Sequence, residues 1–206
     1  MPGTVGTPST LERLKEACLF FLRFCVEPQG MGTPLPTSRR VADTIARELS
    51  EHVAETVVEV GTGSGSLTRG ILEAVDDGRR VLCIEKNTAF REGLERRFGN
   101  RVHVVCADAL KLPSLIDDTD WEQPDAIVSS VPLVIPRGEE FCRTMADVLG
   151  PGGLCLQLAN YPVPLRAHFQ IKKSYSFPTN IPPERLHRAI PGSIDTKNRE
   201  ERSPDR

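Results

Sequence analysis

Three acidic residues follow one another along the chain at positions where they could bind a single ligand. Glu59 lies in the segment VVEVGTGSG, residues 57–65, where an apolar run enters a glycine-rich turn. Glu85 and Asp108 come at the ends of the next two apolar runs. Glycines permit positive φ angles and let a ligand lie against the backbone. The Glu59 carboxylate beside the turn would repel a pyrophosphate and attract a cation. Glu85 could accept hydrogen bonds from two ribose hydroxyls, and Asp108 could accept one from an adenine amino group.

Each of these signals has an ordinary alternative when it is taken alone. Dinucleotide-binding enzymes use a similar G-x-G-x-x-G turn, so the glycines do not select one ligand. Glu85 could be a solvated strand end, and Asp108 could form a turn through its side chain. Together, three acids after three strands indicate one site at the carboxyl edge of a parallel sheet, where open α/β folds bind ligands.

The segments that must position these groups alternate between short apolar runs and amphipathic stretches, which is typical of an α/β fold. Helices are predicted at 38–52, capped by Ser38, and at 66–75, 88–98 and 139–149. Strands are predicted at 57–60, 80–85, 102–106, 126–130 and 154–159. Two further strands, 171–177 and 185–190, complete a mostly parallel seven-stranded sheet flanked by helices.

The composition indicates a single ordinary domain. The 206 residues carry a formal net charge of −2 and are 39% hydrophobic, so bulk charge does not indicate a nucleic-acid or membrane role. The six cysteines form no CxxC pair and no metal-ligand cluster is seen, which favours reduced thiols and no metal. Without a secretion signal, we expect a cytoplasmic protein.

The two ends of the chain differ from its middle. Residues 1–9 and 191–206 are expected to be disordered, 10–36 to form an amphipathic helix and a loop, and 37–190 to form the domain. The apolar stretch 17–26 is shorter than the roughly 20 residues that a membrane-spanning helix needs. Phe20, Phe21 and Phe24 widen the apolar face of this helix, which could therefore lie on a membrane surface or cover the sheet or the active-site mouth as a lid.

The order EVGTGSG, IEKN, ADAL and PGG resembles class I S-adenosylmethionine-dependent methyltransferases over residues 38–160. This resemblance implies a Rossmann-like fold and S-adenosylmethionine as the cofactor, with S-adenosylhomocysteine as its product. It implies that Glu59 and the glycines surround the methionine moiety, that Glu85 binds the ribose, and that Asp108 binds the adenine. The full expected cofactor set is Glu59, Gly61, Thr62, Gly63, Gly65, Glu85, Lys86, Asp108, Ala109, Leu110 and Ser129.

The segment SSVPL, residues 129–133, follows the fourth strand, where this fold presents residues beside the transferable methyl group. It offers hydroxyls and backbone carbonyls, which suit an amine better than a catechol or a carboxylate. In ribosomal RNA adenine dimethylases an aromatic residue stands where this chain has Leu133. Its loss removes a base-stacking contact worth about 1–3 kcal/mol. The expected catalytic residues are Ser129, Ser130 and Tyr161.

Over residues 15–188 the chain also resembles bacterial phospholipid N-methyltransferases. The matching stretches are PTSRR at 36–40, VPL at 131–133 where that family has a Leu-Pro-Leu type segment, NYP at 160–162 and NIPP at 180–183. Ser130-Val131 in place of Gly-Leu, Thr37 in place of Ser and Asn160 before the tyrosine depart from that family. The resemblance implies methylation of the phosphatidylethanolamine headgroup amine, in up to three rounds, at the inner face of the membrane. An RNA adenine N6-methyltransferase and a small-molecule amine methyltransferase are the alternatives.

Several residues are expected to face the substrate or an anionic membrane. Residues 161–190 contain five basic residues and one Glu, a local net charge of +4 that would suit lipid headgroups or RNA phosphates equally and could also be an ordinary solvated face. The expected substrate or membrane contacts are Phe20, Phe21, Phe24, Arg39, Pro132, Leu133, Tyr161 and His168.

Overall fold

The computed structural model describes residues 38–76, 81–119, 123–133, 137–159, 164–180 and 183–192. The predicted first helix with Phe20, Phe21 and Phe24 lies outside the described residues, as do Tyr161 and the tail from residue 193.

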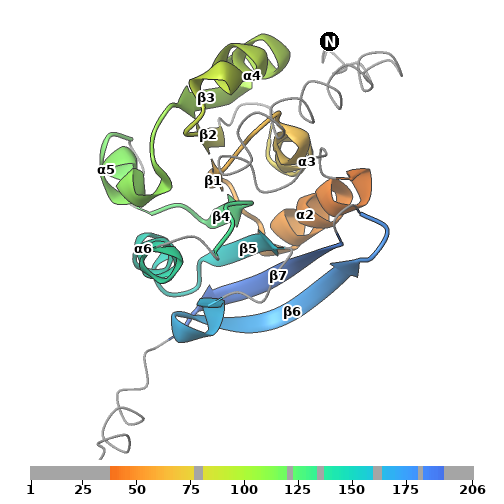
Figure 1. Ribbon diagram of the computed structural model, residues 1–206, viewed down its shortest axis with the longest axis vertical. Coiled ribbons are helices and arrows are strands. Elements are labelled where there is room, and N and C mark those ends of the chain that lie inside the picture. Colours follow the sequence, from red (N-terminus) through yellow and green to blue (C-terminus); the bar gives the residue numbers. More distant parts are fainter. Residues whose placement is uncertain are drawn as a thin grey trace, which may run out of the picture.

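Seven strands form one sheet in the order β3-β2-β1-β4-β5-β7-β6 (Figure 1). Strands β1 to β5 are parallel, whereas β7 runs antiparallel to both β5 and β6. The mostly parallel seven-stranded sheet is therefore confirmed, and the predicted strand bounds differ by at most two residues. The strands are β1 Val57–Val60, β2 Val81–Ile84, β3 Val102–Val105, β4 Ala126–Ser129, β5 Leu154–Ala159, β6 Phe169–Phe177 and β7 Glu184–Pro191.

The helices agree with the predicted pattern with three differences. Helix α5 was not predicted, the stretch 88–98 begins with a 3₁₀ turn before α4, and Ser38 precedes α2 without a side-chain cap hydrogen bond. The 3₁₀ turn forms because the Asn87 side chain accepts a hydrogen bond from the Ala89 amide at 3.0 Å. The helices are α2 Arg39–His52, α3 Ser66–Ala74, α4 Arg91–Phe98, α5 Leu112–Asp117 and α6 Gly138–Leu149.

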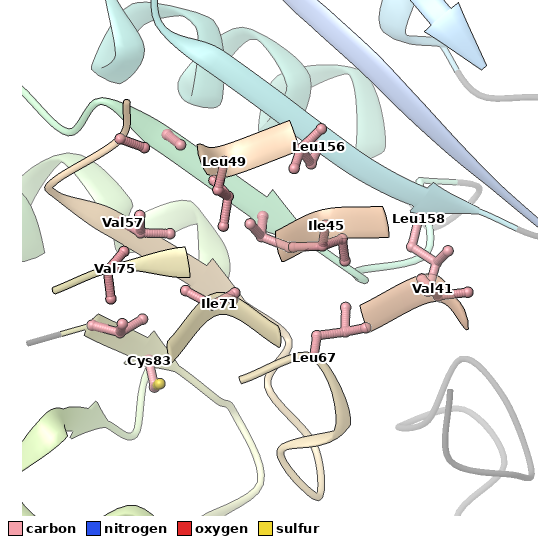
Figure 2. Packing of buried hydrophobic residues seen from close by; sticks show 14 of the residues in the cluster. Val41, Ile45, Leu49, Val57, Leu67, Ile71, Val75, Cys83, Leu156 and Leu158 are labelled. Atoms are coloured by element: carbon pink, nitrogen blue, oxygen red, sulfur yellow. The ribbon is translucent and has the colours of Figure 1, made fainter. Parts of the chain in front are cut away.

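Helices cover both faces of the sheet, and each face has its own hydrophobic cluster. One cluster joins α2, α3 and α4 to the sheet, and Figure 2 shows Ile45, Ile71 and Leu156 meeting within it. The other cluster joins α5 and α6 to the opposite face. Alternation along β1 divides its side chains between the faces, because Val57 belongs to the first cluster and Val58 to the second.

The carboxyl ends of β1 to β5 share one edge, and strand order changes direction between β1 and β4. Open α/β sheets bind ligands at such a switch point. Strand β6 ends at this edge, because Phe177 pairs with Glu184 and Ala159 pairs with Arg185. The same pairing places the start of β6 at the opposite, amino edge.

Candidate active site

The glycine-rich turn after β1 depends on backbone geometry that only glycine adopts easily. Gly61, Gly63 and Gly65 have φ angles of +78°, +55° and +83°. At Gly65 a side chain would also collide with helix α4, since a Cβ there would lie 2.6 Å from Phe98 and 2.8 Å from Leu94. The turn therefore packs tightly against α4 and presents its backbone at the carboxyl edge of the sheet.

Glu85 holds this turn from the neighbouring strand. Its Oε2 accepts a hydrogen bond from the Gly63 amide at 2.7 Å, and its Oε1 accepts one from the Asn87 amide at 2.8 Å. The side chain is buried, so both contacts are shielded from water. A carboxylate has about four acceptor positions, which leaves capacity for the ribose hydroxyls that the resemblance implies.

Glu59 lies beneath the turn, fully buried at 1% exposure. Its Oε2 accepts hydrogen bonds from Thr68 at 2.6 Å and from the Cys83 thiol at 3.8 Å. Loss of water around the carboxyl raises the pKa of Glu59 to about 8, against the opposing effect of the Thr68 hydrogen bond. Burial therefore favours the protonated form of Glu59 as long as no cation lies beside it.

Two buried side-chain oxygens lie at this place, Glu59 Oε1 and Thr62 Oγ1. Glu59 Oε1 has no hydrogen-bond partner among the residues that the structure describes, whereas the Thr62 hydroxyl interacts with the Cys83 thiol. Buried polar groups are nearly always paired, so the unpaired oxygen of Glu59 indicates a ligand that supplies a hydrogen-bonding group. The amino group of a methionine moiety has the required donors. The residues under the turn thus fit the cofactor that the sequence predicts.

Asp108 forms a turn through its side chain, which is one of the two roles that the sequence allows for it. Its Oδ1 accepts a hydrogen bond from the Leu110 amide at 3.0 Å, and its Oδ2 pairs with Lys86 at 3.2 Å. The Leu110 amide lowers the pKa of Asp108, and Lys86 adds to this effect. Asp108, Ala109 and Leu110 are all partly exposed beyond β3, where the sequence predicts that the adenine binds.

The loop after β4 is bonded directly to the glycine-rich turn. The Ser130 hydroxyl donates a hydrogen bond to the Gly61 carbonyl at 2.6 Å, and the Ser130 amide donates to Val60 at 3.1 Å. Ser129 is fully buried, and its Oγ accepts a hydrogen bond from the Val131 amide at 3.3 Å. The structure thus places Ser130 between the two loops and Ser129 beneath them.

Two residues expected near the substrate are not at the site. Leu133 is 4% exposed and packs in the cluster beneath α6. Its side chain is therefore not available to contact a substrate. His168 precedes β6 and therefore lies at the amino edge of the sheet. The direction of β6, which depends on β7 lying between it and β5, could not be seen in the sequence.

Pro132 and Arg39 do lie toward the carboxyl edge. Pro132 is partly buried in the loop after β4, and Arg39 begins α2 with an exposed side chain that pairs with Asp43 at 3.7 Å. The four-residue segment with Tyr161 is outside the described residues.

Gln157 on β5 was not identified from the sequence. It is fully buried, and its Nε2 donates hydrogen bonds to the Val131 carbonyl at 3.0 Å and the Leu158 carbonyl at 2.7 Å. The only signal available was one amide side chain within the apolar strand LCLQLA.

The basic segment 161–190 divides into two groups in the structure. Arg188 and Lys173 turn toward α2, where buried Glu48 lies 2.8 Å from Arg188 and 3.9 Å from Lys173 and also accepts a hydrogen bond from Tyr175. Lys172 contacts Gln170. These three contacts leave fewer cations for a ligand than the sequence count implied.

Arg166 and Arg185 form the second group. Both are exposed, and neither has an ion-pair partner within the described part of the chain. Burial lowers the pKa of the His187 ring, and the nearby cations Arg185 and Arg166 lower it further. A small cationic surface therefore remains on the β6–β7 side of the sheet.

No group of three or more His, Cys, Asp or Glu side chains among the described residues is arranged to hold a metal ion. No helix within the described ranges is both long and apolar enough to cross a bilayer.

Known proteins similar to this chain are methyltransferases. Residues 57–153 match a family model described as a methyltransferase domain. An ornithine lipid N-methyltransferase from Singulisphaera acidiphila is 29% identical over 179 residues, which are 82% of this chain and 93% of that protein. A mitochondrial ribosomal RNA small subunit methyltransferase from Arabidopsis thaliana is 30% identical over 112 residues, 52% of this chain but 27% of that protein.

The fold is shared with a solved methyltransferase. The O-methyltransferase TomG from Streptomyces achromogenes, in complex with SAM, has a TM-score of 0.67 and 15% identity, with 93% of each chain covered. The Rossmann-like fold expected from the sequence is confirmed, and S-adenosylmethionine, the cofactor expected from the sequence, is the one that TomG binds.

Proposed function

We propose that this chain, an S-adenosylmethionine-dependent methyltransferase, transfers methyl groups to the headgroup amine of a membrane lipid. The observation that carries this proposal is the hydrogen bond between Ser130 and Gly61, which holds a loop of oxygen acceptors against the cofactor turn. Phosphatidylethanolamine and its methylated intermediates are the substrates that the sequence favours. The similar ornithine lipid enzyme adds a second amino lipid to test.

The chemistry suits the groups that the loop presents. The bound cofactor supplies an electrophilic methyl group, and transfer forms an N–C bond while the S–C bond breaks. The amine must first lose a proton, since its lone pair attacks, and the remaining N–H groups need acceptors. Ser130 already donates its hydrogen to Gly61, so its oxygen is available as an acceptor for the amine. We assign proton transfer to Tyr161 or water.

A membrane surface is the proposed location of this reaction. Arg166 and Arg185 are exposed cations, and each basic residue near an anionic bilayer contributes about 1 kcal/mol to binding. Phe20, Phe21 and Phe24 would supply apolar contacts from the first helix. We therefore propose a peripheral enzyme at the inner face of the membrane.

The test begins with the wild-type protein. Titration with S-adenosylhomocysteine measures the cofactor site, and radiolabelled S-adenosylmethionine then measures transfer to separate vesicles containing phosphatidylethanolamine or ornithine lipid. We expect label in an amino lipid. Binding of S-adenosylhomocysteine with label only in ribosomal RNA, or only in a soluble amine, would overturn the lipid proposal and keep the cofactor.

Two serine variants test the part played by the loop. Ser130→Ala should lower lipid methylation at least tenfold, because it removes both the link to Gly61 and an acceptor for the amine. Ser114→Ala is the matched control, since Ser114 makes a similar hydroxyl-to-carbonyl bond of 2.9 Å on the surface of α5. Equal activity of the two variants would show that Ser130 has no role in transfer.

A further inference from the structure

The buried amide of Gln157 is placed beside the acceptor loop. Gln157 on β5 pairs in register with Ser129, the last residue of β4. Side chains paired across neighbouring strands lie on the same face of the sheet, which brings the amide under the loop that follows Ser129. From there Nε2 reaches the Val131 carbonyl at 3.0 Å.

The two peptide groups of Val131 are both held by buried side chains. The Val131 amide donates to Ser129 Oγ, and the Val131 carbonyl accepts from Gln157. The plane of each peptide is therefore fixed. A carbonyl oxygen has two lone pairs, so the bond to Gln157 leaves one for another donor.

The other end of the Gln157 amide is not satisfied. Its Oε1 is buried and has no hydrogen-bond partner among the described residues. An unpaired buried acceptor costs about 1–3 kcal/mol. Cys155, whose side chain is on the same face of β5 as that of Gln157, is fully buried in the apolar cluster beneath α6, so this face accepts an apolar side chain. The Gln157 nitrogen joins the Leu158 carbonyl of its own strand, at 2.7 Å, to the acceptor loop, and packing alone does not account for an amide with this arrangement.

We propose that Gln157 is a positioning residue that holds the Val131 carbonyl as an acceptor for an N–H of the substrate amine. The inference rests on the proposed amine methylation and adds the group that orients the nucleophile. In-line attack depends on this orientation, and a displacement of about 1 Å can cost 100-fold in rate. Gln157 touches neither reactant, so it acts through the carbonyl.

The first experiment compares Gln157→Leu with Gln170→Leu, which changes an exposed glutamine on β6. For Gln157→Leu we expect kcat to fall about 10- to 100-fold, with affinity for S-adenosylhomocysteine within about twofold of wild type. A kcat within twofold of wild type would overturn the proposal. So would a loss of kcat matched by an equal loss of S-adenosylhomocysteine binding, which indicates a structural role.

A second variant keeps the proposal testable if Gln157→Leu folds poorly. In Gln157→Glu, a protonated carboxyl can donate to the Val131 carbonyl, whereas a carboxylate repels it. The activity ratio of this variant to wild type should therefore rise as the pH falls. His187 on β7 pairs in register with position 157 and also titrates, so Gln157→Leu, which keeps His187, serves as the control and should show a flat ratio. A flat ratio for Gln157→Glu would contradict the inference.

These outcomes are separate from a failure of the proposed function. All activities are measured on whichever amine the wild type methylates. If that amine is in RNA or a soluble compound, the lipid proposal fails while Gln157 is still tested on the actual substrate.

Discussion

Substitution of Gly65 by alanine should destabilise the protein by an amount that the structure divides into two parts. The first is backbone strain, since a φ of +83° costs an L-residue about 1–2 kcal/mol. The second is overlap, because the new Cβ would lie 2.6 Å from Phe98 and 2.8 Å from Leu94, well inside normal carbon contacts. Both neighbours are buried, so overpacking adds about 1–3 kcal/mol.

Gly152→Ala is the matched control for this measurement. Gly152 has a φ of +90°, and a Cβ there would meet nothing within 4 Å. It precedes β5 at the amino edge, far from the glycine-rich turn, and should lose only the strain term of about 1–2 kcal/mol. Urea unfolding should show a difference of about 1–3 kcal/mol between the variants, and only Gly65→Ala should weaken S-adenosylhomocysteine binding, by tenfold or more. Equal unfolding free energies, or unchanged binding by Gly65→Ala, would refute the reasoning.

Three further predictions concern charged groups. The pKa of Glu59 is about 8 when folded and about 4.5 when exposed, so its stabilising effect is complete below pH 4.5 and is lost as the pH rises through 8. The free energy of unfolding of wild type should therefore fall across this window by up to about 1.4 kcal/mol per pH unit relative to Glu59→Gln, and parallel curves would contradict this. Arg188→Met should cost about 2–3 kcal/mol because it leaves buried Glu48 short of a partner, whereas Arg185→Met should change stability by less than about 0.5 kcal/mol in the same urea assay. Glu85→Leu should lower S-adenosylhomocysteine affinity about 100-fold in calorimetry, since the Gly63 amide loses its acceptor; an unchanged affinity would place the ribose elsewhere.

The elements that the sequence predicted well are those with a strong local pattern. The strands Val57–Val60 and Leu154–Ala159 are apolar runs that each contain a single polar residue, and both have the predicted bounds. Helix α5, Leu112–Asp117, is only six residues long, too short for a helical period to appear. The sequence also predicted which edge of the sheet carries the site, because the carboxyl ends of parallel strands lie at the same edge.

The contacts within the site could not be predicted, because they depend on packing between distant segments. Leu133 is buried in a cluster that also contains Leu165 and Phe169, which come from a later part of the chain. Gln157 and Val131 are 26 positions apart and meet only through the register of β4 and β5. Residue type indicated which groups could act, but not which of them were already bonded to the protein.

The bond from Ser130 to Gly61 also bears on how methyltransferases of this shape can diverge. It uses a backbone carbonyl on one side, so this bond requires no particular side chain in the turn, only a short hydrogen-bond donor at residue 130. A relative with glycine at that position must maintain the spacing between its two loops by other means. One substitution at position 130 therefore changes the link between the two loops and the oxygen acceptor offered to the amine at the same time.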